Sequence, residues 1–197
     1  MKKLILASTS PRRQELLRAL RIPFEAVAPE CDESHPEGMA GADIPLFLAE
    51  KKVASVRESL RGRKLPVVGA DTAVLLGGAV LGKPKSRAEA EGFLRALSGK
   101  RHSVVSGVAL FDPATGRASA VRAETDVFFK ELSDGEMSWY LGTGEWMGAA
   151  GGYRIQERGA FFVRKIVGSH SNVVGLPLSE LYDMLCAHGF MSGAEPL

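Results

Sequence analysis

Residues 4–17, with the sequence LILASTSPRRQELL, decide how the amino-terminal part of the chain folds. The first four residues of the stretch are apolar, and the polar residues after them limit the run to one short buried strand. A helix is predicted to begin at Pro11, because proline suits the first helical position and Ser10 suits the N-cap before it. Leu16 and Leu17 then belong to the buried face of this helix. A strand that passes through a short loop into a helix is typical of α/β folds.

The start of this helix is a candidate anion-binding site. A helix N-terminus offers unpaired backbone N–H groups and the positive end of the helix dipole. Here it carries the hydroxyls of Ser8 and Ser10 and the guanidinium groups of Arg12 and Arg13, which can hold phosphates in bidentate fashion. The alternative is a capped helix with solvated arginines. The Gly-x-x-x-x-Gly-Lys-Ser/Thr pattern of a P-loop is absent from the sequence.

A second candidate site follows the apolar run at residues 66–70, which predicts a central strand ending in Asp71 and Thr72. Residues at the carboxyl end of such a strand line the usual ligand crevice of an α/β sheet. A carboxylate there can bind a divalent metal or accept a proton from water. The alternative is an aspartate that only forms a turn.

The rest of the chain alternates helices and strands early and forms hairpins later. This order predicts a mixed, twisted α/β sheet with helices on its faces, and no internal repeat is present. We expect one domain over residues 1–190 and a frayed tail over residues 191–197. The further elements predicted from periodicity, capping boxes and turn residues are helices at 44–60, 86–97, 133–141 and 177–189, a hairpin around Gly77-Gly78, and strands at 102–111, 121–129 and 160–167.

Three further segments carry side chains that suit a nucleotide site. Lys52 in the second helix and Lys83 in a loop before a proline can neutralise phosphate charge, although most lysines only solvate a surface. In residues 151–156, glycines allow close approach of the backbone, and the Gln156 amide can donate to and accept from a base edge. A flexible turn followed by a strand is the alternative for that segment.

The composition of the chain excludes several classes of protein. With 197 residues, 45% hydrophobic residues and a net charge of +2, the sequence is that of an ordinary globular protein without the clustered basic face of a nucleic-acid binder. Cys31 and Cys186 lie far apart, which favours two reduced thiols over a zinc or redox motif. A signal peptide and an apolar run of membrane-spanning length are not recognisable, so a cytoplasmic protein is expected.

Taken in order, these segments resemble the Maf family of nucleotide pyrophosphatases. The resemblance covers roughly residues 4–188, and it rests on the order and spacing of modest motifs. It departs from the usual pattern at Ala149 and Arg154, where many relatives have Lys and Gly. The residues that carry it are the opening stretch 4–17, Glu33, Lys52, Gly69-Ala70-Asp71-Thr72, Gly82-Lys83-Pro84, Leu97-Ser98-Gly99 with His102, Thr125-Asp126-Val127, residues 151–156 and Val174-Gly175-Leu176-Pro177.

The resemblance implies a fold with two lobes around a deep cleft, similar to inosine triphosphate pyrophosphatases, and a metal-dependent cleavage between the α and β phosphates of a nucleoside triphosphate. Asp71 matches the catalytic acid, and it and Glu33 would hold Mg²⁺ or Mn²⁺. Arg12, Thr72 and Gln156 match the branch that acts on dTTP and UTP. Ser8, Arg13, Lys52 and Lys83 match polar positions that line the substrate pocket.

Three points stay open at the level of the sequence. The branch of the family that acts on 7-methyl-GTP is one alternative, and a nucleotide-binding regulator of cell division without turnover is another. Dimers are common among relatives, so a homodimer is possible, whereas no nucleic acid polymer and no membrane is expected as a partner. The substrate is expected to be a nucleoside triphosphate, with either a normal or a modified base.

Overall fold

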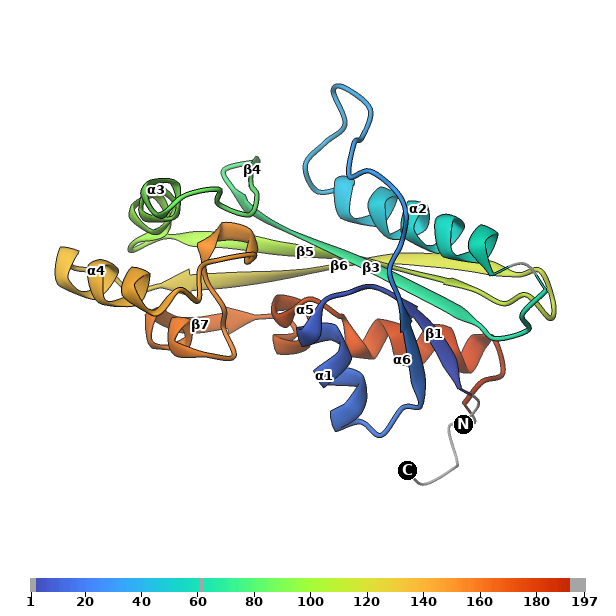
Figure 1. Cartoon of the computed structure of the whole chain (residues 1–197). Helices are drawn as coiled ribbons and strands as arrows, with labels where there is room; N and C mark the ends of the chain where they lie inside the picture. Colours follow the sequence, from blue (N-terminus) through green and yellow to red (C-terminus); the bar gives the residue numbers. More distant parts are fainter. Residues whose placement is uncertain (1–2, 61, 192–197) are drawn as a thin grey trace.

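A computed structural model of the chain describes residues 3–60 and 62–191, and it has a long twisted sheet with helices on both faces (Figure 1). Over the described residues the sheet is seven-stranded, with the order β2-β1-β3-β5-β6-β7 and with β4 beside β3. The strands are β1 (Leu4–Ala7), β2 (Phe24–Val27), β3 (Val67–Leu76), β4 (Ala79–Leu81), β5 (Arg101–Phe111), β6 (Ala118–Phe129) and β7 (Val163–Val167). The helices are α1 (Pro11–Ala19), α2 (Ile44–Ser59), α3 (Arg87–Leu97), α4 (Asp134–Thr143), α5 (His170–Val174) and α6 (Leu178–Ala187), with the short 3₁₀ helices η1 (Ala150–Gly152) and η2 (Arg158–Phe162).

The predicted strand-loop-helix unit at the amino terminus is confirmed. Strand β1 pairs in parallel with both β2 and β3, and its four residues are completely buried. Leu4 and Leu6 contact the core beneath α1 and α6, whereas Ile5 and Ala7 contact the core beneath α2. This alternation follows from the two-residue period of a strand. Because β1 is covered on both faces, its apolar run is continuous.

Strand β3 is longer than its sequence predicts. The prediction that it ends in Asp71 and Thr72 is wrong, since both residues lie in the middle of a strand that continues to Leu76. The reason is the neighbouring strand β5, which pairs antiparallel with β3 along residues 67–75 and supplies ladder hydrogen bonds through the polar pair. Strand β1, by contrast, ends opposite Gly69. Asp71 therefore still lies just beyond the carboxyl end of the parallel part of the sheet.

Two glycines bring α2 unusually close to the sheet. A Cβ atom at Gly107 in β5 would lie 2.3 Å from Leu46 Cα, and one at Gly69 in β3 would lie 2.8 Å from the Ala49 carbonyl oxygen. Both distances are far below a normal contact, so only glycine allows this approach. The close packing places Lys52, on the buried side of α2, directly over β3.

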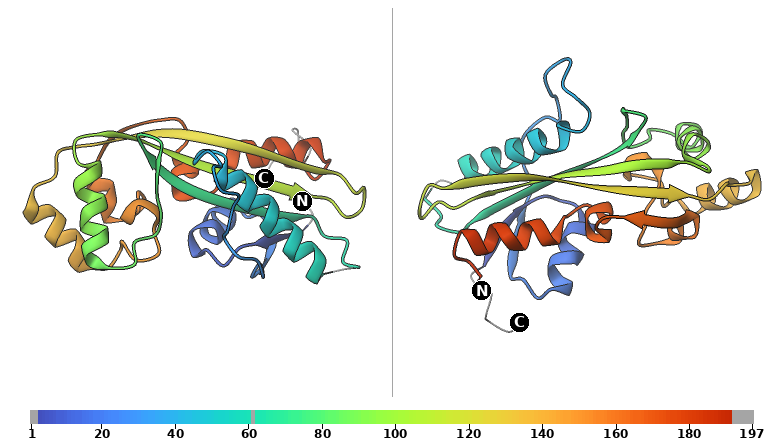
Figure 2. Two further views of the ribbon diagram at one scale, coloured as in Figure 1. Left: turned by 90° about the horizontal axis from the view of Figure 1, so that it is seen from above. Right: turned by 180° about the vertical axis from the view of Figure 1, so that it is seen from behind.

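The sheet joins two lobes, which lie at opposite ends of its length (Figure 2). We call the end with β1, β2, α1, α2 and α6 the α1 lobe, and the end with α3, α4, β4, β7, η1 and η2 the α3 lobe. The α3 lobe has its own core, in which Leu94, Tyr140 and Phe162 are almost completely buried. The α1 lobe has one core on each face of the sheet. The predicted mixed sheet flanked by helices in two lobes is confirmed.

The remaining predicted elements are present with changed ends. Ser133 and Glu136 form the complete capping box of α4, whereas Ser86 caps α3 alone, because the Glu89 carboxylate accepts from the Lys85 backbone N–H instead. The predicted strand 160–167 begins as η2, and β2 and α5 are not predicted at all. Residues 192–197 of the predicted tail lie outside the described residues, and the single domain over 1–190 stays a prediction. Among residues 3–60 and 62–191, none of the helices has the length and apolar character that a membrane span requires.

Candidate functional site

A polar pocket of about 500 Å³ lies between the two lobes, at the carboxyl end of β1. The α1 lobe contributes the loop after β1, the start of α1 and Lys52, and the α3 lobe contributes Lys83 and the segment from Met147 to Gln156. All of the predicted site residues line this one pocket: Ser8, Arg12, Arg13, Glu33, Lys52, Asp71, Thr72, Lys83 and Gln156.

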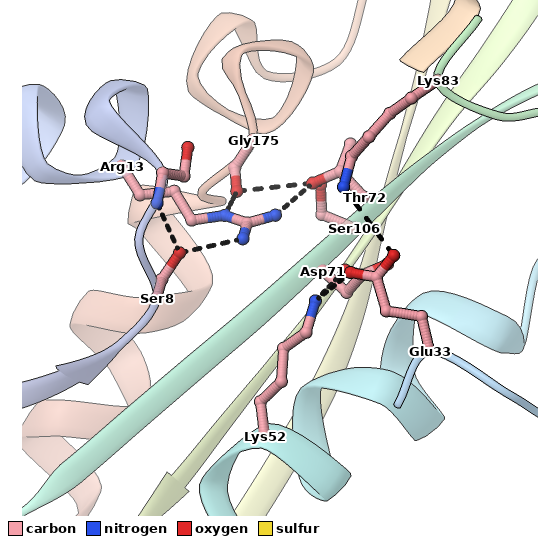
Figure 3. Close-up of polar contacts among 10 residues, drawn as sticks. Ser8, Arg13, Glu33, Lys52, Asp71, Thr72, Lys83, Ser106 and Gly175 are labelled. Atoms are coloured by element: carbon pink, nitrogen blue, oxygen red, sulfur yellow. Dashed lines mark hydrogen bonds and ion pairs between the residues drawn. The ribbon is translucent and has the colours of Figure 1, made fainter. Parts of the chain in front are cut away.

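Lys52 holds two carboxylates at the floor of the pocket (Figure 3). Its Nζ donates to Glu33 Oε1 at 3.2 Å and to Asp71 Oδ1, although only 9% of the side chain is exposed. Lys83 Nζ approaches the other Glu33 oxygen at 3.7 Å from across the pocket. Burial raises the pKa of Glu33, but Lys52, Lys83 and Arg13 outweigh it and lower the pKa overall. Glu33 is therefore ionised at neutral pH.

Arg13 is fixed by three of its five N–H donors. Its Nε donates to the Gly175 carbonyl at 2.8 Å, Nη1 to Ser8 Oγ at 3.2 Å and Nη2 to Thr72 Oγ1 at 3.3 Å (Figure 3). Burial lowers the pKa of this guanidinium and the nearby Asp71 carboxylate raises it, but arginine stays charged in proteins. Two donors remain for a ligand, held in a preset orientation.

A buried polar network behind the pocket supports Thr72 and thereby Arg13. Thr72 Oγ1 lies 2.8 Å from Ser106 Oγ on β5, and Ser106 donates to the Asn172 carbonyl at 3.2 Å. Because Ser106 donates its proton to that carbonyl, Thr72 shares its own proton between Ser106 and the Gly175 carbonyl, 3.4 Å away, and accepts from Arg13. The Asn172 amide donates to Val104 O and Thr125 Oγ1, each at 3.0 Å. Ser106 and Asn172 are absent from the sequence prediction, although a serine within an apolar strand is a usable signal.

The predicted N-cap residue of α1 is at the expected position but does not make the expected side-chain hydrogen bond to any of the described residues. Ser10 occupies the N-cap position of α1 with extended backbone, but its side chain makes no capping hydrogen bond within the described chain. Instead, the Ser10 backbone N–H donates to Ser8 Oγ at 3.1 Å. Ser8 is 4% exposed, and its hydroxyl joins the loop to Arg13.

Tyr153 lines the pocket and is held from behind by a buried histidine. Its hydroxyl is 2.8 Å from His102 Nε2, and the two rings and Phe129 pack edge to face. Burial lowers the pKa of His102 from 6.5 to about 4. His102 thus supports Tyr153 from within the core.

The low pKa of His102 predicts an acid-sensitive fold. Below pH 6.5 the unfolded chain binds a proton at His102 that the folded chain accepts only near pH 4, so the free energy of unfolding decreases as the pH falls through this window. Between pH 7 and 4.5 this one group should remove about 2–3 kcal/mol. Urea unfolding of wild type and His102→Gln at both pH values measures it. The variant should show the smaller decrease, and equal decreases in both proteins would contradict the prediction.

The fold and this pocket define an α/β protein whose pocket suits a small ligand with several negative charges, because cationic side chains from both lobes line the cavity. Residues 3–188 match the family model described as Maf-like protein, and the chain belongs to this family.

Curated relatives match over nearly the whole chain. A dTTP/UTP pyrophosphatase of Pelotomaculum thermopropionicum is 45% identical over 96% of this chain and 98% of its own length. A dTTP/UTP pyrophosphatase of Symbiobacterium thermophilum is 47% identical over 96% of each chain, and one of Yersinia pestis is 45% identical over 94% of this chain and 92% of its own. The solved structure of the Staphylococcus aureus Ham1 protein has the same fold, with a TM-score of 0.50, 13% identity, and coverage of 95% of this chain and 100% of that one.

Proposed function

We propose that this chain hydrolyses dTTP and UTP to the nucleoside monophosphate and pyrophosphate. The observation that carries the proposal is the convergence of Arg13, Lys52 and Lys83 with two carboxylates in one pocket between the lobes. The relatives named dTTP/UTP pyrophosphatase support the choice of reaction and substrate, since they match this chain almost from end to end. The substrate would be a free nucleotide rather than a nucleic acid polymer. A cytoplasmic location and a homodimer stay predictions from the sequence.

The cations of the pocket would bind the phosphate chain of the nucleotide. Arg13 keeps two N–H donors beyond its contacts with Ser8, Thr72 and Gly175, which suits bidentate binding of phosphate oxygens. Lys52, Lys83 and Arg12 add positive charge from other sides of the pocket. Such preset donors stabilise charge that develops on the phosphates and on the leaving pyrophosphate.

The two carboxylates suit a divalent metal. Glu33 and Asp71 each place an oxygen beside the same ammonium group of Lys52, so both already stand around one position that favours positive charge. In the described part of the chain, no three His, Cys, Asp or Glu side chains cluster as a complete metal site. Mg²⁺ prefers one or two carboxylates and completes its shell with phosphate oxygens and water. Glu33 and Asp71 would hold the ion, which when bound neutralises charge on the phosphates.

Asp71 would act on the attacking water. Its carboxylate is 14% exposed and faces the pocket, where it can orient a water molecule and accept its proton. The water oxygen attacks the α phosphorus in line, the bond to the bridging oxygen breaks, and pyrophosphate leaves with that oxygen. Lys52 keeps the Asp71 carboxylate in place through its hydrogen bond.

Thr72 and Gln156 would recognise the pyrimidine. The Gln156 Nε2 group is buried and has no hydrogen-bond partner among the described residues, so it is available to a base carbonyl. The Thr72 hydroxyl donates its one proton toward Ser106 and the Gly175 carbonyl and accepts from Arg13, which leaves one lone pair for the N3–H of thymine or uracil. Cytosine lacks this N–H, so a site of this kind should reject it.

A substrate panel tests the proposal. Purified protein with Mg²⁺ or Mn²⁺ should release pyrophosphate, detected separately from phosphate, most strongly from dTTP and UTP and more weakly from dCTP and purine triphosphates. Pyrophosphate mainly from 7-methyl-GTP would leave the reaction in place and remove the assigned base reading. A protein that binds nucleotide but releases no pyrophosphate with any metal would instead be a binding regulator.

A further inference from the structure

Two arginines from distant parts of the sequence hold one wall of the pocket. Arg154 Nη2 donates to the Met147 carbonyl at 2.9 Å, and Arg12 Nη2 donates to the next carbonyl, that of Gly148, at 3.4 Å. Both arginines line the pocket together with this loop. The two guanidinium groups therefore lie next to each other at the pocket wall, although no prediction from periodicity or motif pairs them.

The carboxylates near Arg12 do not offset its burial and the neighbouring guanidinium group. Burial lowers the pKa of Arg12, and the neighbouring Arg154 lowers it further. Arg154 Nη1 donates to both oxygens of Glu157, at 3.1 and 3.3 Å, and Glu157 and Glu15 raise the pKa of Arg12 by less than burial and Arg154 lower it. Like charges at close range are unfavourable unless an anion binds between them.

Arg154 also has an unused donor. Its Nε is buried, and no hydrogen-bond partner for it is present in residues 3–60 and 62–191. A buried N–H without a partner costs free energy that an incoming acceptor would restore. Arg154 is itself only 26% exposed at its side chain, so this donor is not simply hydrated at an open surface.

We propose that Arg154 is a further substrate-binding residue, which together with Arg12 binds an anionic oxygen of the nucleotide's phosphate chain. A neutral base carbonyl could accept the Nε hydrogen bond, but a phosphate oxygen also carries the negative charge that two adjacent guanidinium groups favour. The assignment rests on the proposed function, because it takes the ligand to be a nucleoside triphosphate. It makes the α3 lobe an active part of phosphate binding beyond Lys83.

Binding measurements on Arg154→Ala test the assignment without turnover. The probes are inorganic pyrophosphate, uridine 5′-α,β-imidotriphosphate, whose α–β bridge resists hydrolysis, and uridine, all titrated calorimetrically. The variant should bind pyrophosphate and the imidotriphosphate about 10- to 100-fold more weakly, the range of a lost charge-assisted hydrogen bond. Uridine binding should not change. In turnover of UTP the KM should rise more than kcat falls, because the contact exists before the transition state.

Two variants separate phosphate binding from support of the loop. Glu157→Ala removes the ion pair that anchors Arg154 but keeps its charge. It should leave pyrophosphate affinity unchanged or increase it, since a competing carboxylate is gone, whereas a purely structural role of Arg154 predicts a loss as in Arg154→Ala. Arg95→Ala is the matched control, because Arg95 is paired with Glu91 and Asp134 in the same lobe but does not line the pocket.

The outcomes distinguish this assignment from the proposed function. If wild type hydrolyses UTP while Arg154→Ala keeps wild-type affinity for pyrophosphate and the imidotriphosphate, the assignment is overturned and the function stands. Equal weakening for uridine and pyrophosphate would also overturn it, as would parallel losses in Arg154→Ala and Glu157→Ala. Wild type that neither binds these phosphates nor hydrolyses a triphosphate would remove the proposed function and this assignment together.

Discussion

Asp71→Asn should reduce kcat for dTTP and UTP by about 10²–10⁴-fold, the usual contribution of a positioned proton acceptor. The amide keeps the shape of the side chain in the middle of β3 but loses the negative charge and the basicity that the attacking water requires. The measurement is pyrophosphate release under saturating substrate with Mg²⁺ or Mn²⁺. Thermal unfolding of the variant should show that it is folded, since Asp71 is a partly exposed residue at the pocket rather than part of a core.

Asp126→Asn provides the matched control for this experiment. Asp126 also lies within a strand, accepts from Ser103 Oγ at 2.9 Å and pairs with Arg101 at 3.2 Å, but it does not line the pocket. Its variant should keep turnover within about twofold of wild type, because the Asp126 side chain lies outside the pocket. Wild-type turnover in Asp71→Asn would falsify the role of Asp71, whatever the control shows.

Gly107→Ala should destabilise the protein by about 3 kcal/mol or more, because the added methyl meets backbone rather than a movable side chain. The new Cβ would lie 2.3 Å from Leu46 Cα, 2.4 Å from Leu46 N and 2.5 Å from the Pro45 carbonyl oxygen. Helix α2 must therefore move away from β5. Since α2 carries Lys52 above Asp71, the KM for UTP should increase as well. Urea unfolding and steady-state kinetics measure the two effects.

Gly92→Ala serves as the control, because a methyl group at this position meets no neighbouring atom of the described chain. Gly92 lies inside α3, and a Cβ there has no atom within 4 Å in the described structure. Alanine is the better helix former, so this variant should be more stable than wild type by about 0.5–1 kcal/mol, with unchanged kinetics. A Gly107→Ala protein of wild-type stability would show that α2 does not depend on this close approach.

The local signals along the chain predict much of the fold. The strand at residues 4–7, the helix start at Pro11, the Gly77-Gly78 hairpin and the capping box of Ser133 and Glu136 each depend on neighbours in sequence, and all of them are present. The predicted end of β3 is wrong because neighbours in sequence do not determine where this strand ends. Its continuation through Asp71 and Thr72 depends on pairing with Gly107 and Ser106 of β5, which lie 36 and 34 residues further along the chain.

The sequence by itself determined which side chains could serve a nucleotide, because their chemistry and order are local properties. The ammonium, guanidinium and carboxylate groups of the site are all recognisable there, and every one of them lines the same pocket. Only the tertiary structure decided how they act on one another. Lys52 bridges both carboxylates, Thr72 holds Arg13, and Arg12 lies next to Arg154. These residues come from different elements and are 19 to 142 positions apart in the sequence. Such contacts arise only when α2 packs on the sheet and the two lobes meet. Local propensity does not determine which distant residues come into contact.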